Sequence, residues 1–149
     1  MTARTSNGGN RQRGTTAVEF SIVALVFFTL LIGIMEMGRL LWTWNAAVEA
    51  TRLGARLAVV CSMNDGAIAS RMRGMLPALA VANIDIDYLN PPFADNTCTV
   101  DNCKAVRVRL TGYTHATVIP LVPLSLPIPP FQTTLPREGM NSIGNPLCS

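Results

Sequence analysis

Residues 11–39 read RQRGTTAVEFSIVALVFFTLLIGIMEMGR, and this stretch decides the fold. Phe20–Met35 contains sixteen residues without a charge, and counting from Ala17, past Glu19, gives nineteen positions. A helix needs about 20 mostly apolar residues to cross the hydrocarbon core of a bilayer. The run is too long for the apolar part of a secretory signal, and no small-residue cleavage site closes it. We therefore predict a retained transmembrane helix over about residues 17–36.

The charges that flank this apolar run predict its orientation. Arg4, Arg11 and Arg13 precede it, whereas Glu36 and Arg39 follow it and nearly cancel. Positively charged residues close to a span are retained on the cytoplasmic side. We expect the N-terminus to be cytoplasmic and the residues after about 40 to be outside.

The basic character of the chain comes from its first residues. The whole chain has 12 Lys and Arg against 9 Asp and Glu, a net charge of +3. Residues 1–14 hold three of the positive charges and no negative one, so nine of each sign remain beyond them. A nucleic-acid-binding protein needs a basic patch on its folded part. We therefore expect no nucleic-acid partner.

The helix is predicted to continue beyond the membrane to about residue 61, because no proline interrupts residues 39–61. A helix over about 15–61 would be about 70 Å long at 1.5 Å per residue. One side of it carries a polar stripe, Asn45, Glu49, Arg52 and Arg56, and the other side carries Ala47, Ala50, Gly54 and Ala58. Small residues let another helix approach closely, although alanine is also simply the best helix former. The costly Gly54 favours packing, and we expect this face to contact other subunits.

Residues 63–149 are predicted to form a small α+β head. Asn64-Asp65-Gly66 is a turn that can cap a second helix from Ala67 to about Leu79, ended near Pro77. Alternating residues predict a short antiparallel sheet. The alternating strands are expected at Ile84–Tyr88, with Asp85 and Asp87 on a solvated face, and at Ala105–Leu110, continuing toward Tyr113. A final short strand is expected around Gln132–Arg137. The tail from Gly139 is expected to be irregular.

A proline-rich apolar stretch, VIPLVPLSLPIPPF, occupies residues 118–131. Its five prolines exclude a regular helix and a central strand. Three interpretations remain open: a loop packed on its own core, a flap that touches the membrane, or a contact surface for a partner.

Four cysteines, Cys61, Cys98, Cys103 and Cys148, all follow the apolar run, so they share one compartment. Three pairings are possible. The short spacing of Cys98 and Cys103 favours a local bridge, which would leave Cys61 and Cys148 to join the long helix to the C-terminus. A zinc site is the weaker alternative, because the chain has no C-x2-C pair and a single histidine, His115. We expect disulfides, which persist outside the cytoplasm, and no metal or other cofactor.

The residues with chemical meaning are Gly14, Thr15, Glu19 and Phe20. A basic segment ends in glycine, and a carboxylate follows five residues later in an apolar helix. Glycine leaves an extended backbone accessible to a peptidase. A carboxylate within a span costs about 2.5–3.5 kcal/mol on insertion scales, so it needs a partner. Cleavage after Gly14 would supply one, the new ammonium of Thr15, one helical turn away.

This arrangement resembles the type III prepilin signal, and further motifs resemble the TadE-like family. They are Val18-Glu19-Phe20, the G-x-x-E-x-G-R step formed by Gly33, Glu36, Gly38 and Arg39, and Gly54-Ala55-Arg56. The resemblance covers residues 14–60 and is faint afterwards. One departure is Leu25, where the family often has a proline.

The resemblance implies a minor pseudopilin of the tight adherence, Flp-type, pilus system in the bacterial inner membrane. A prepilin peptidase would cut after Gly14, making residues 1–14 a cytoplasmic leader and Glu19 the residue for processing or subunit register. The implied partners are that peptidase, other pilin-like subunits and the pilus assembly platform.

Other functions fit the residues less well. No nucleophile elbow, metal cluster or phosphate loop accompanies His115, so we expect no enzyme. A bitopic adaptor or sensor that keeps its leader has the same topology and is the alternative. A major pilin or a secretion pseudopilin is a further alternative, but the head is large for a thin fibre.

Overall fold

The computed structural model of the chain describes residues 12–93, 98–119 and 123–148. The chain divides into two units, Met1–Gly38 and Arg39–Ser149. Helix α1, Gln12–Val60, supplies the described part of the first unit and continues into the second. The predicted long helix is confirmed to within one residue at its C-terminal end, and at its N-terminal end it begins three residues earlier than expected.

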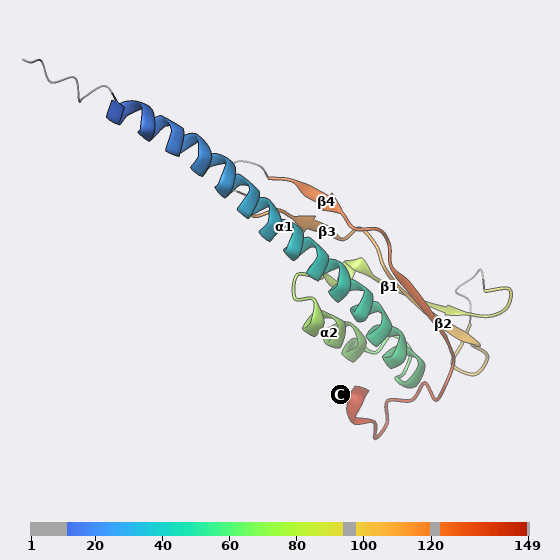
Figure 1. Ribbon diagram of the computed structural model, residues 1–149. Coiled ribbons are helices and arrows are strands. Elements are labelled where there is room, and N and C mark those ends of the chain that lie inside the picture. Colours follow the sequence, from blue (N-terminus) through green and yellow to red (C-terminus); the bar gives the residue numbers. More distant parts are fainter. Residues whose placement is uncertain (1–11, 94–97, 120–122, 149) are drawn as a thin grey trace, which may run out of the picture. The chain divides into compact units, whose positions relative to one another are not determined.

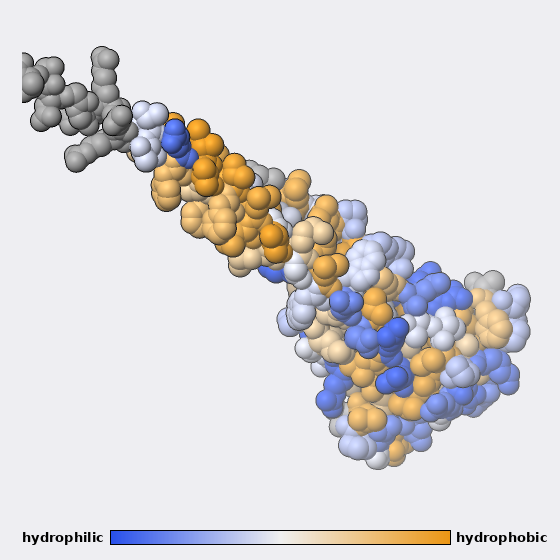
Figure 2. Space-filling model, viewed as in Figure 1, coloured by the Kyte–Doolittle hydropathy of each residue, from blue (hydrophilic) through white to orange (hydrophobic). Residues whose placement is uncertain are grey.

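The first unit exposes an apolar helix surface. Along α1 the residues Phe20, Leu25, Leu30 and Ile34 are each more than half exposed, and Figure 2 shows an apolar surface over this part of the helix. Among the described residues, one helix, Gly14–Val60, is long and apolar enough to cross a membrane, and its most apolar stretch is not buried within the protein. The described part of the chain therefore contains one candidate span near the N-terminus, as the sequence predicts, and Leu25 lies within an unbroken helix.

The second unit is an α+β head (Figure 1). Helix α2, Gly66–Met75, packs with the C-terminal half of α1, and strands β1, Ile84–Leu89, β2, Ala105–Leu110, and β5, Gln132–Pro136, form an antiparallel sheet in the order β1-β2-β5. A second, two-stranded sheet pairs β3, Thr114–Ala116, with β4, Ser125–Pro127. Two short 3-10 helices, Val81–Asn83 and Pro146–Cys148, complete the described elements.

The core of this unit lies between the helices and the three-stranded sheet. Buried side chains of α1 and α2 meet one face of the sheet, and the largest include Leu57, Ile68, Met72, Val106 and Val108. The register places Tyr88 opposite Val106 and Ile86 opposite Val108 on this face. The period-two alternation in the sequence thus selects the core face.

Three local features differ from the sequence expectation. Helix α2 ends at Met75, four residues early, because Pro77 disfavours a helical backbone at Leu76, which is non-helical with φ −131° and ψ 83°. Strand β2 stops at Leu110 and does not continue to Tyr113, since Gly112 turns the chain with a φ of +64°. Part of the proline-rich stretch, Ser125–Pro127, forms strand β4, which pairs with β3 in a two-stranded sheet of the described residues and is therefore an edge strand, as its prolines require.

The expected solvated face of β1 is also wrong in part. Asp87 is buried, and its Oδ2 lies 3.0 Å from Arg109 Nη2, which also contacts Asp85 Oδ2 at 2.6 Å. Leu89 is buried on the same face. Alternation identifies the two faces of a strand, but it does not show that the second face is also partly buried.

Candidate functional site

The predicted processing site lies in the first turn of α1. Because the helix begins at Gln12, the Gly14–Thr15 peptide bond is helical in this structure. A Cβ at Gly14 would meet nothing within 4 Å, and the residues from Gly14 to Phe20 are exposed. The first turn of a helix lacks intrahelical acceptors for its N–H groups, so opening it breaks few hydrogen bonds. The backbone here is accessible, although it is not extended.

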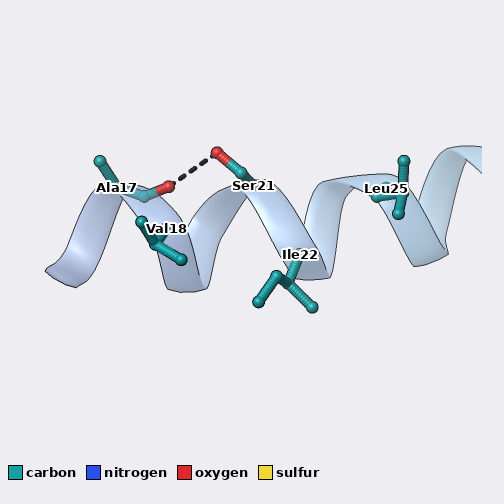
Figure 3. Close-up of a pocket in the computed structure, with 5 residues that line it drawn as sticks. All are labelled: Ala17, Val18, Ser21, Ile22 and Leu25. Carbon is teal, nitrogen blue, oxygen red and sulfur yellow. Dashed lines mark hydrogen bonds between the residues drawn. The ribbon is translucent and has the colours of Figure 1, made fainter. Parts of the chain in front are cut away.

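Glu19 lies on an exposed part of the same helix. Its neighbours Val18 and Phe20 are 60% and 73% exposed, and no described residue forms an ion pair with Glu19. It stands four residues after Thr15, the spacing that brings side chains together on one helix face. The surrounding surface is a shallow apolar groove lined by Ala17, Val18, Ser21, Ile22 and Leu25 (Figure 3). The Ser21 hydroxyl donates to the Ala17 carbonyl (2.7 Å) within the helix.

The residues of the G-x-x-E-x-G-R motif occupy consecutive turns of α1 on both sides of the unit boundary. A Cβ added at Gly33 or Gly38 would meet no atom of the described chain within 4 Å. Arg39 begins the second unit and lines a groove there with Trp42 and His115. The motif residues are therefore not gathered into one internal site.

The small-residue face of α1 is occupied by the chain's own head. Ala47, Ala50 and Ala58 have no exposed surface, and a Cβ at Gly54 would overlap the thioether of Met72, which is itself fully buried. These residues are therefore packed within the head of the same chain, where Met72 of α2 meets Gly54. The expectation that this face contacts other subunits is corrected accordingly.

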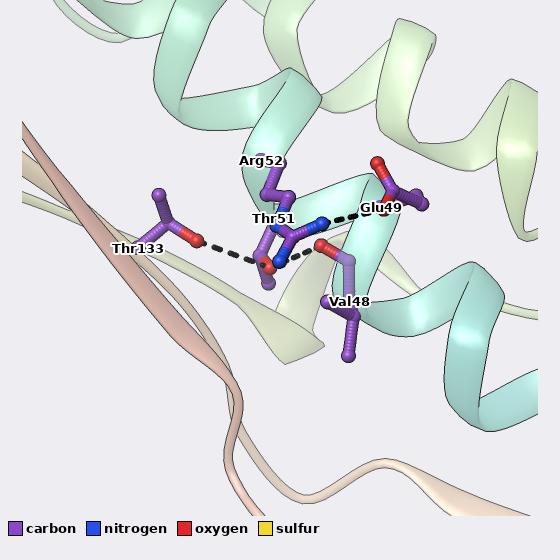
Figure 4. Close-up of polar contacts among 5 residues, drawn as sticks. All are labelled: Val48, Glu49, Thr51, Arg52 and Thr133. Atoms are coloured by element: carbon purple, nitrogen blue, oxygen red, sulfur yellow. Dashed lines mark hydrogen bonds and ion pairs between the residues drawn. The ribbon is translucent and has the colours of Figure 1, made fainter.

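The polar stripe on α1 is exposed as predicted. Arg52 Nη1 donates to Glu49 Oε1 at 2.7 Å (Figure 4), and Asn45 and Arg56 are exposed as well. Exposed pairs of this kind stabilise a helix only slightly. Beside this stripe, Thr51 is buried, and its hydroxyl donates to the Val48 carbonyl (2.7 Å). The Thr133 hydroxyl of β5 lies 3.4 Å from it, a helix–sheet contact that sequence reasoning missed.

Both expected disulfides are present. Cys61 is bonded to Cys148 with Cα atoms 5.6 Å apart, and Cys98 is bonded to Cys103 with Cα atoms 5.0 Å apart. The first bridge joins the residue after α1 to the C-terminal 3-10 helix. The second joins two cysteines that are five residues apart in the segment before β2.

The C-terminal tail also caps α1, which sequence reasoning did not predict. The amides of Met140 and Asn141 donate to the carbonyls of Val59 and Val60, at 3.1 and 2.8 Å. These carbonyls have no intrahelical partner because they lie in the last turn. The tail thus replaces water at the end of the helix.

A polar cluster next to this cap involves Ser62, Asp65 and Ser142. The Ser142 amide donates to the Ser62 hydroxyl (3.0 Å), and the Ser142 hydroxyl donates to the Asp65 carboxylate. Asp65 also accepts from the Ala67 amide (2.9 Å), as the predicted helix cap requires. These hydrogen bonds, that of Ser142 first, favour the charged carboxylate and hold the pKa of Asp65 below its ordinary value.

Tyr88 completes this region from the sheet side. Its hydroxyl oxygen accepts from the Asn64 amide (2.8 Å), and burial of the side chain raises the pKa of Tyr88. The turn at residues 62–66 is therefore fixed from the tail and from β1. The cluster joins the turn that follows α1 to the C-terminal tail and to β1.

No metal-ligating group of three or more His, Cys, Asp or Glu side chains occurs among the residues that the structure describes. His115 is buried on β3, and Asp85 and Asp87 pair with Arg109. These side chains have structural contacts.

Comparison with known proteins addresses the N-terminal half of the chain. Residues 14–56 match the family described as TadE-like protein. Comparison with curated proteins and with solved structures gives no significant match. The matched residues include the glycine–glutamate pair and all three motifs. The match confirms the resemblance to the TadE-like family over residues 14–56 and, with the candidate membrane helix, fits a pilus-related membrane protein.

Proposed function

We propose that this chain is a minor pseudopilin of the tight adherence, Flp-type, pilus system. A prepilin peptidase hydrolyses the peptide bond between Gly14 and Thr15, and the mature protein then takes part in pilus assembly in the inner membrane. The role is non-enzymatic. The observation that carries the proposal is the position of Glu19, an acid on an exposed apolar helix one turn beyond Gly14–Thr15.

Hydrolysis changes the charge near Glu19. Water adds across the peptide bond, so the leader leaves with a new carboxylate and Thr15 keeps a new ammonium group. Within a span a lone carboxylate costs about 2.5–3.5 kcal/mol on insertion scales. The ammonium of the same chain, or of a neighbouring subunit, compensates that charge. Processing therefore creates the partner that makes Glu19 tolerable in the bilayer.

The first turn of α1 supports access by a peptidase. Gly14 and Thr15 are exposed, and the turn has few hydrogen bonds to lose. A glycine in a helix costs about 1 kcal/mol relative to alanine, which favours local opening. The peptidase therefore meets a helix end that opens readily.

Topology follows from the flanking charges and is consistent with the bridges. The arginines before the span keep the leader in the cytoplasm. The two disulfides then lie in the periplasm, where they persist. Contacts with other pilin-like subunits use the exposed part of α1, since the small-residue face is already covered by the head.

Piliation of the native host tests the assembly role. A strain that lacks the protein should lose pili and regain them with the wild-type gene, but not with Glu19→Ala. Glu49→Ala is the matched control, because Glu49 is an exposed acid of the same helix outside the predicted span. Normal piliation with Glu19→Ala, at wild-type protein levels in the membrane, would count against the proposal and favour an unprocessed bitopic adaptor.

A further inference from the structure

The second unit begins at Arg39, within α1. It exposes an apolar surface formed by the first residues of α1 after that point and by the β3–β4 hairpin. We call it the apolar collar. Its side chains are between 39% and 69% exposed, and they are Leu41, Trp42, Trp44, Val118, Leu124 and Leu126.

Contacts within the unit hold the hairpin against the helix. Trp42 of α1 lines one groove together with His115 and Val118 from the β3 strand and the residues after it. Trp44 packs edge-to-face on Phe131, with ring centroids 5.1 Å apart. The Ile128 amide donates to the Tyr113 carbonyl (3.0 Å) at the base of the hairpin, just before β3 and just after β4. Trp42 of the helix and Val118 of the hairpin therefore border one groove, together with Arg39, and Leu126 of β4 lies opposite His115 of the same groove.

The hairpin and its flanks lack charge. Between Arg109 and Arg137, residues 110–136 contain no Lys, Arg, Asp or Glu. An exposed segment facing only water would normally carry charges, and a large apolar surface marks an interaction site. The absence of any charge over this length fits an environment in which charge is costly.

The position of the collar in the chain identifies that environment. Leu41 and Trp42 follow the predicted span, which ends at about residue 36, by about one and a half helical turns. Tryptophan is enriched where a span meets the membrane surface. Apolar side chains at that depth lie about 5–10 Å into the boundary between headgroups and acyl chains.

We propose that the apolar collar inserts into the bilayer interface where α1 leaves the membrane. The β3–β4 hairpin is then a second membrane contact of the head, separate from the span. This inference rests on the proposed membrane anchoring of α1. Its effect is to hold the head at the bilayer surface before the protein joins other subunits.

Depth-dependent quenching tests the inference on the full chain in phosphatidylcholine vesicles that contain lipids brominated on their acyl chains. Trp42→Phe and Trp44→Phe remove the native tryptophans. Single reporters are then introduced as Leu124→Trp in the hairpin, Leu147→Trp in the C-terminal 3-10 helix and Ile34→Trp in the span. Leu124 and Leu147 are matched, since they are 52% and 56% exposed.

We expect brominated lipid to quench the Leu124→Trp reporter several-fold more strongly than the Leu147→Trp reporter. Equal, weak quenching of both, with strong quenching of Ile34→Trp, would overturn the inference and leave the anchoring intact. Weak quenching of Ile34→Trp as well would overturn both. A Leu124→Trp reporter that is shielded from aqueous quencher but not reached by lipid bromine would show that a second copy of the chain covers the collar, and would also overturn the inference.

A charge in the hairpin gives an independent test. With Trp44→Phe, Trp42 is the single tryptophan, and brominated lipid should quench it. Adding Leu126→Asp should reduce that quenching several-fold, because an aspartate opposes insertion. Unchanged quenching of Trp42 would contradict a role for the hairpin in the contact.

Discussion

Gly54 of α1 lies directly against the thioether of Met72 in α2, so closely that a Cβ at position 54 would overlap the sulfur atom. Met72 has no exposed surface into which it could move. The glycine is therefore a packing requirement of the head, where the two helices meet.

Gly54→Ala should lower the stability of the head. Overpacking a core costs about 1–3 kcal/mol, which outweighs the gain of about 1 kcal/mol from replacing a helical glycine by alanine. We expect a lower urea midpoint for the full chain in detergent micelles, followed by near-ultraviolet circular dichroism. Gly74→Ala in α2 is the control, because a Cβ there meets nothing within 4 Å, and it should leave stability unchanged or raise it.

Combining Gly54→Ala with Met72→Ala separates the clash from other causes. The double variant should be more stable than the sum of the two single losses indicates, since the smaller side chain removes the overlap. Additive losses, or a Gly54→Ala protein as stable as Gly74→Ala, would refute this packing relationship.

The two disulfides should contribute unequally to stability. Their bonded cysteines are 87 and 5 residues apart in the sequence. In the loop-entropy description, removing a bridge over the long loop costs about 4–5 kcal/mol, and over the short loop about 2 kcal/mol. Urea unfolding of Cys61→Ala/Cys148→Ala and Cys98→Ala/Cys103→Ala measures both losses. A larger loss on removing the Cys98–Cys103 bridge would contradict the loop-entropy explanation.

Asp65 should give the head an acid-dependent stability. Its pKa is lower in the folded head than in the unfolded chain, because Ser142 and Ala67 donate to its carboxylate. This contribution is complete above the ordinary carboxyl pKa and is lost as the pH falls below it, through the lowered value.

Ser142→Ala should raise the pKa of Asp65 toward its ordinary value, since it removes the largest cause of the shift. A nuclear magnetic resonance titration of the Asp65 carboxyl group measures this change. Ser70→Ala replaces an exposed serine of α2 and should leave the titration as it is. An identical Asp65 titration in the two variants would contradict the role of Ser142.

Much of this architecture could be predicted from local patterns. The charge-free run from Phe20 to Met35 predicts α1, and the spacing of Cys98 and Cys103 left only one pairing for Cys61 and Cys148. Alternation located β1 and β2. Each of these patterns involves residues that are close together in the sequence, so one sequence is enough to recognise it.

The misplaced details depend on contacts between distant residues. Small side chains on α1 predict a close neighbour, but nothing in their spacing distinguishes Met72 of the same chain from a residue of another subunit. Asp87 looks like a solvated strand residue until Arg109 and the covered face of the sheet are known. The tail gave no periodic signal, because the amides of Met140 and Asn141 donate to the last carbonyls of a helix that ends 81 residues earlier, Val59 and Val60.

The mature N-terminus is the most direct test of the account. Mass spectrometry of the protein isolated from membranes of its native host should find Thr15 as the first residue, with the preceding 14 residues removed. The same host without its prepilin peptidase should yield the uncut chain. A protein that retains the bond between Gly14 and Thr15 in the presence of the active peptidase would contradict the proposed function, because Glu19 would then never meet the ammonium group that processing supplies.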